Sequence, residues 1–134
     1  MDRTAGLTGY YILSLFLLAI YSERVTFMKL ERDFQKDLIK EIKSILPGCF
    51  VLKQDAGYKQ GIPDLLILYG KKWAALECKK SASATKRPNQ DYYVETMNKM
   101  SFASIIFPEN KEEVLHDLQQ ALKPGRKTRA SGSK

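Results

Sequence analysis

Two apolar stretches of this sequence contain ionisable side chains at a regular spacing. Asp64 stands directly before the apolar run 65–69, and Glu77 and Lys79 lie at the end of the run 73–79. In an extended strand Glu77 and Lys79 point to the same side, because side chains alternate between the two faces. A hairpin that presents Asp, Glu and Lys on one surface is suited to hold a divalent cation beside a phosphate.

Mg²⁺ prefers oxygen ligands, keeps several waters, and is usually held by one or two carboxylates together with substrate phosphate. Asp64 and Glu77 could supply these carboxylates, since the short turn 70–72 makes their two strands neighbours. The cation would polarise a phosphate and acidify a bound water. Lys79 could orient that water or neutralise the charge that grows on the phosphate.

Each of these residues also has a structural interpretation. Pro-Asp is a common turn pair, so Asp64 could only cap the start of a strand. A carboxylate inside an apolar strand is unfavourable unless it is paired or bound to a metal, which makes Glu77 harder to dismiss. Its partner could simply be Lys79 or Lys80.

The hydrophobic pattern predicts three helices and four strands around these residues. Apolar residues at three- and four-residue steps indicate a helix over residues 29–46, which Pro47-Gly48 ends. We expect strands at 49–54, 62–69, 73–79 and 101–107, and further helices at 88–100 and 110–122. The last helix would begin with Asn110 as its cap. This order predicts an α/β fold with a central mixed sheet and helices packed against it.

The length of 134 residues suits one domain. We divide the chain into an apolar N-terminal extension, a domain and a basic tail, which cover residues 1–27, 28–122 and 123–134. The formal net charge of +7 comes mainly from the tail, which lacks carboxylates and is expected to be disordered. The domain has a second basic cluster, which suits a polyanion such as nucleic acid or is simply a solvated loop face: Lys71, Lys72, Lys79, Lys80, Lys86 and Arg87.

The N-terminal extension is unusual in being almost wholly apolar from residue 7 to residue 21. That stretch is shorter than the roughly 20 residues of a membrane span. It also makes a poor signal peptide, because Asp2 lies in the leader and residues 19–21 are not a small-x-small cleavage site. We expect residues 1–27 to be a gene-model extension or a dispensable appendage, with a marginal membrane anchor as the alternative.

The order Pro63-Asp64 followed by Glu77-Cys78-Lys79 resembles the PD-(D/E)xK nuclease superfamily. More narrowly, residues 28–122 resemble its small VRR-NUC and archaeal Holliday junction resolvase-like branch, which phages often carry. Three further features support this resemblance: the approach Gly61-Ile62-Pro63 to the aspartate, Glu31 on the first helix, and Gln90 early in the helix after the Glu-x-Lys strand.

The resemblance implies a restriction-endonuclease-like core and a set of site residues. It implies catalytic roles for Asp64, Glu77, Lys79 and Gln90, and metal ligation by Glu31, Asp64, Glu77 and the backbone carbonyl of Cys78. The residues expected to bind the nucleic-acid backbone are Lys71, Lys72, Lys80, Lys86 and Arg87. Two of these assignments have plain alternatives, since Glu31 could be a solvated acid in a first helical turn and Gln90 a helix-start residue.

The function that follows is a Mg²⁺- or Mn²⁺-dependent endonuclease that hydrolyses DNA phosphodiester bonds, with branched DNA such as a Holliday junction among its candidate substrates. Junction cutting would fit a homodimer, and RNA stays open as a substrate. The alternative is a non-catalytic nucleic-acid-binding module of the same fold, which would bind DNA in a salt-sensitive way without cleaving it. The resemblance to phage proteins implies the cytoplasm of a bacterial host, and a membrane partner is not expected.

Overall fold

The computed structural model describes residues 4–55 and 57–123 (for residues 4–7 and 27–29, the backbone only). The predicted basic tail, apart from Lys123, lies outside these residues. The helices are α1 (Thr4–Ile45), α2 (Gln90–Met100) and α3 (Lys111–Leu122), with a short 3₁₀ turn η1 (Pro108–Asn110) before α3. The strands are β1 (Phe50–Lys53), β2 (Leu65–Tyr69), β3 (Lys72–Cys78) and β4 (Phe102–Ile106).

The four strands form one mixed sheet in the order β1-β2-β3-β4. β1 and β2 pair antiparallel, as do β2 and β3, and β3 pairs parallel with β4. A parallel pair needs a crossover connection, and α2 supplies it between β3 and β4. The expected α/β fold with a mixed sheet is therefore confirmed.

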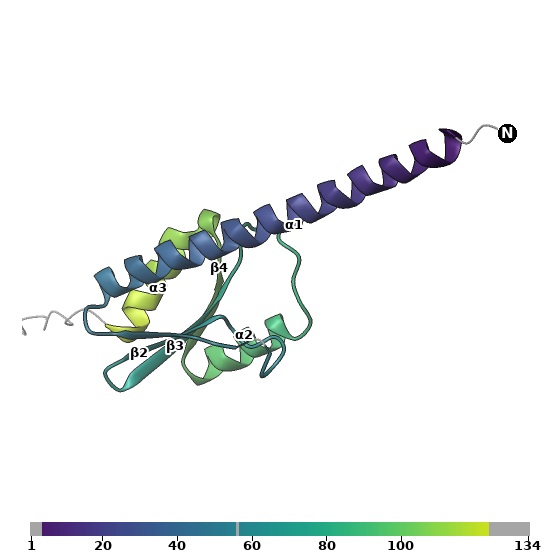
Figure 1. Cartoon of the computed structure of the whole chain (residues 1–134). Helices are drawn as coiled ribbons and strands as arrows, with labels where there is room; N and C mark the ends of the chain where they lie inside the picture. The colour runs from purple at the N-terminus through teal and green to yellow at the C-terminus, as the bar shows by residue number, and fades with distance from the viewer. Residues whose placement is uncertain (1–3, 56, 124–134) are drawn as a thin grey trace, which may run out of the picture.

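Helices cover both faces of this sheet (Figure 1). On one face α1 and α3 pack against the strands, and α2 lies on the opposite face. The core between α1, α3 and the sheet is built from aliphatic side chains, with Leu38 and Ile42 of α1, Leu118 of α3 and Leu65 and Ile67 of β2 all essentially inaccessible to solvent. Burial of such side chains contributes about 1.5–3 kcal/mol each, so this layer is the main source of stability for the strands.

Helix α1 is longer than the sequence pattern predicted. The expected helix over residues 29–46 is only its C-terminal part, because the same helix runs without a break from Thr4. No proline lies between residues 4 and 46, so nothing in the sequence stops the helix before Pro47-Gly48. The described side chains from Thr8 to Thr26 are all exposed, and this half of α1 projects away from the sheet (Figure 1).

Two helix starts also differ from expectation. Helix α2 begins at Gln90, two residues after the predicted Pro88. Asn110 precedes α3 but its side chain makes no capping bond to that helix. Its amide instead accepts a hydrogen bond from the Phe107 N–H (2.8 Å) and donates one to the Ile105 carbonyl (3.0 Å), so it fixes the end of β4.

Gly61, in the loop before β2, contacts the loop before α2. Its φ is +89°, a conformation that favours glycine, and a Cβ placed there would lie 2.7 Å from the Pro88 carbonyl oxygen and 2.8 Å from Asn89 Cβ. Asn89 itself has a positive φ of 67°. The two loops are thus in backbone contact, and this contact brings the start of β2 close to the start of α2.

Replacing Gly61 should therefore be more harmful than replacing a glycine with the same backbone conformation in open space. Gly48 has a φ of +87° and nothing within 4 Å of its hypothetical Cβ, which makes Gly48→Ala the matched control. We expect Gly61→Ala to lower the free energy of unfolding by about 1–3 kcal/mol more than Gly48→Ala, because overpacking adds to the strain. Denaturant unfolding of the full chain measures both values, and equal losses would show that the loop contact contributes nothing.

Candidate active site

Asp64 and Glu77 stand opposite each other on neighbouring strands. Leu65 of β2 pairs with Leu76 of β3, and continuing this antiparallel register by one residue sets Asp64 against Glu77. Asp64 Oδ2 accepts a hydrogen bond of 2.9 Å from the backbone N–H of Cys78. This bond turns the Asp64 side chain toward β3, beside the carboxylate of Glu77.

Glu77 is buried, at 2% exposure, and one of its oxygens is held by Gln90. Gln90 Nε2 donates a hydrogen bond of 2.8 Å to Glu77 Oε1, while Gln90 Oε1 accepts one of 2.8 Å from the Arg87 backbone N–H. The second carboxylate oxygen, Oε2, is buried and has no hydrogen-bond partner among the described residues. A buried oxygen without a donor is unfavourable, so Oε2 requires either a proton or a bound cation.

The electrostatic surroundings of Glu77 favour its neutral form when no cation is present. Burial, followed by the negative charge of Asp64, raises the pKa of Glu77 to about 8, although the ammonium of Lys79 opposes this effect. The pKa of Glu31 is also raised, mainly by burial. A positive charge placed beside Glu77 would therefore favour its ionised form.

Lys79 is the third buried polar group, at 6% exposure. Its Nζ lies 3.8 Å from Glu77 Oε1, which is longer than a hydrogen bond and near the limit for an ion pair. Its backbone N–H donates to the Ile106 carbonyl (2.8 Å) and so extends the β3–β4 pairing past Cys78. The ammonium is thus fixed beside Glu77 without being fully engaged by it.

These side chains open into two cavities of about 280 Å³ each. Asp64, Glu77 and Arg87 line both cavities. The first, which we call the site cavity, lies between α1 and the strand ends and has four cationic and three acidic side chains in its wall: Arg32, Lys53, Lys79, Arg87, Glu31, Asp64 and Glu77. The acids thus share one cavity with a slightly larger number of cationic side chains.

The donor set fits Mg²⁺ better than a metal that needs several protein ligands. Within residues 4–55 and 57–123, no three His, Cys, Asp or Glu side chains are placed to hold one metal ion together. Mg²⁺ requires only one or two carboxylates, and Glu77, with its unpartnered Oε2, stands beside a second carboxylate, Asp64. Glu31 lines the same cavity, but within the described residues it does not complete a three-carboxylate site with Asp64 and Glu77.

The structure brings together most of the predicted site residues. Glu31, Asp64, Glu77, Lys79 and Arg87 share the site cavity, and Gln90 contacts Glu77 directly. The thiol of Cys78 packs in the core, and burial raises its pKa, so the thiol stays protonated and is not expected to bind a metal.

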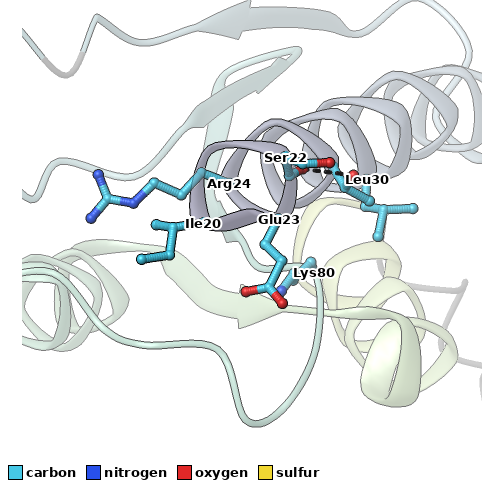
Figure 2. Close-up of a pocket in the computed structure, with 7 residues that line it drawn as sticks. Ile20, Ser22, Glu23, Arg24, Leu30 and Lys80 are labelled. Carbon is cyan, nitrogen blue, oxygen red and sulfur yellow. Dashed lines mark hydrogen bonds between the residues drawn. The ribbon is translucent and has the colours of Figure 1, made fainter. Parts of the chain in front are cut away.

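The other predicted basic residues lie elsewhere. Lys71 and Lys72 are at the β2–β3 turn, which is the opposite end of the hairpin from Asp64 and Glu77. Lys86 pairs with Asp91 at 3.1 Å. Lys80 lines a different and larger cavity of about 550 Å³ beside α1 (Figure 2).

Sequence reasoning missed three residues of the site cavity, namely Arg32, Gln35 and Lys53. Lys53 pairs with Leu65 in the β1–β2 register, which sets it next to Asp64. The alignment of the first predicted strand against the second could have found it. Arg32 and Gln35 follow Glu31 on the same helix, and their inward placement depends on how α1 crosses the sheet.

Comparisons with protein-family models, with curated proteins and with solved structures returned no match. The function of this chain must therefore be inferred from its own residues and their geometry.

The raised pKa of Glu77 predicts a pH-dependent stability of the metal-free chain. Above pH 4.5 the unfolded chain ionises this residue, whereas the folded chain keeps it neutral up to about pH 8. The contribution of Glu77 to stability should thus fall by on the order of a few kcal/mol between these values. In thermal unfolding with a chelator present, the Tm of Glu77→Gln should rise relative to the unaltered chain from pH 5 to pH 8. A constant difference in Tm would contradict this assignment.

Proposed function

We propose that this chain is a Mg²⁺- or Mn²⁺-dependent nuclease with a restriction-endonuclease-like core, and that it hydrolyses DNA phosphodiester bonds. The observation that carries the proposal is Glu77, a buried carboxylate with an unpartnered oxygen, opposite Asp64 and beside the buried ammonium of Lys79. Perturbed ionisable groups that converge in a cavity are typical of catalytic sites. The four-stranded mixed sheet with helices on both faces agrees with the expected core.

A phosphodiester suits the charges of the site cavity. Arg32, Lys53 and Arg87 line its wall and could contact phosphate oxygens. Asp64 and Glu77, which line the same cavity, would repel a phosphate if they stood alone. A divalent cation held between the two carboxylates would remove that repulsion, polarise the scissile phosphate and acidify a bound water.

The remaining side chains have roles that follow from their contacts. Lys79 Nζ, held 3.8 Å from Glu77, could donate a hydrogen bond to the attacking water or to a phosphate oxygen as negative charge develops. Gln90 fixes Glu77 Oε1 and so orients Oε2 toward the cation. Glu31, with its raised pKa, could accept a hydrogen bond from a water in the cavity.

Isosteric changes of the three central residues test the catalytic assignment. We expect Asp64→Asn, Glu77→Gln and Lys79→Met each to lower Mg²⁺-dependent cleavage by at least about 10²-fold, because each removes a charge needed in the transition state. Asp117→Asn, an exposed position on α3, is the matched control and should keep full activity. The assay compares labelled duplex, flap and four-way junction DNA with and without Mg²⁺.

Full activity in any of the three variants would remove that residue from the mechanism. Salt-sensitive DNA binding by the unaltered chain, with no metal-dependent cleavage of any substrate, would favour the non-catalytic binding module instead.

The position of the lysines predicts which of them contact the phosphate backbone. Lys53 lines the site cavity, whereas Lys71 lies at the far turn of the hairpin. We expect Lys53→Ala to weaken DNA binding and to reduce the slope of log K against log salt by about 1, and Lys71→Ala to change neither. Binding titrations over a range of salt concentrations in the presence of Ca²⁺ measure both. A larger effect from Lys71→Ala would place the DNA along the opposite end of the sheet.

A further inference from the structure

The side chains of the N-terminal half of α1 stay exposed where residues 4–55 and 57–123 are described, and none of them belongs to the core. Its described side chains from Thr8 to Thr26 are all exposed, although most of those between residues 10 and 21 are large and apolar. Figure 1 shows this half of the helix extending beyond the sheet and the other helices. Exposed apolar surface of this extent is rare in soluble proteins unless it binds something.

The apolar residues surround the helix instead of forming a stripe. Residues 10–13 and 15–18 are two uninterrupted runs of exposed large apolar side chains, and successive residues of an α-helix are turned by about 100°. A second copy of the chain or a protein groove would require apolar residues on one face only, with polar residues on the other. A helix that is apolar all round is instead typical of the core of a large protein or of a lipid environment, and the described part of this chain does not cover it.

The length of the uncharged segment matches the apolar core of a bilayer. Residues 4–22 contain no ionisable Asp, Glu, Lys or Arg, and at about 1.5 Å per residue they extend over about 28 Å. The hydrocarbon core is about 30 Å thick. Among the described residues, α1 is the helix that is long and apolar enough to cross a membrane.

The charged residues begin abruptly where this segment ends. Figure 2 shows Glu23 and Arg24 of α1, with Lys80 nearby, around the cavity of about 550 Å³. Tyr21 precedes them, and tyrosine is common at the membrane–water interface. Further basic residues, including Arg32, Lys36 and Lys40, follow within about 20 residues of the end of the uncharged segment. Basic residues this close to a membrane helix favour the cytoplasmic side.

We propose that residues 4–22 cross a lipid bilayer and hold the folded domain at its cytoplasmic surface. This replaces the expectation that residues 1–27 are dispensable and that a membrane is not a partner. The anchoring is independent of the proposed nuclease activity. If the chain is a nuclease, its active site would lie close to the membrane. Because α1 is continuous, Glu31 and the site cavity would lie about 14 Å along the helix from Ser22, the last residue of the uncharged segment.

Flotation of membranes in a density gradient tests the proposal with the full chain expressed in bacterial cells. After a carbonate wash, most of the unaltered chain should float with the lipid. The double substitution Phe16→Lys with Leu17→Lys should lower the floating fraction at least about tenfold, since lysine is strongly disfavoured at the centre of a membrane helix. The matched control, Phe50→Lys with Leu52→Lys, adds the same charges to exposed residues of β1 and should float like the unaltered chain.

Three results would overturn the proposal. The unaltered chain could stay with the soluble proteins, either alone or as a dimer of two apolar helices. Mass spectrometry could show that the mature chain lacks the segment, as after signal cleavage. The Phe16 and Leu17 variant could float as well as the unaltered chain. If that variant aggregates, flotation of the unaltered chain and its measured mass decide the question alone.

Discussion

The structure depends on one electrostatic constraint, which is the burial of Glu77 inside the sheet. The side chain is 2% exposed, one oxygen is held by Gln90, and the other has no donor among the described residues. Burial and the charge of Asp64 raise its pKa to about 8, and the ammonium of Lys79 compensates only in part. An ionised carboxylate in this position destabilises the fold, and the proposed cation would offset that cost.

Much of the surrounding structure serves to keep these groups in place. The antiparallel register of β2 and β3 sets Asp64 opposite Glu77. The backbone contact between Gly61 and the Pro88-Asn89 loop brings the start of α2, and therefore Gln90, to the same point. The core formed with α1 and α3 holds the other face of the sheet, so the site is built on rigid elements and not on a loop alone.

Local sequence signals predicted the sheet and the central residues of the site. The short turn between two apolar runs was enough to pair β2 with β3 and so to bring Asp64, Glu77 and Lys79 together. The remaining site residues depend on tertiary arrangement. Lys53 enters the site cavity through the β1–β2 register, and Arg32 enters through the crossing of α1 over the strand ends.

The sequence pattern was least informative for α1, whose C-terminal part packs on the sheet while its N-terminal half is exposed. The amphipathic periodicity of α1 begins near residue 29, where the helix meets the sheet, and this change of pattern was interpreted as a helix start. The backbone continues through it because residues 10–46 contain no glycine or proline and include many good helix formers such as leucine, whereas periodicity reports what the side chains contact. Charge alone also did not show that Lys71 lies far from Asp64 and Glu77, since a basic turn can lie near a site or at the opposite end of the sheet.

The most direct measurement is anomalous X-ray diffraction from crystals of the full chain soaked in Mn²⁺. We predict one strong peak in direct coordination with Asp64 and with Glu77 Oε2, with Gln90 still bonded to Oε1. Crystals that contain no such peak at saturating Mn²⁺, with Glu77 bonded instead to Lys79 or Asp64, would contradict the proposed metal site.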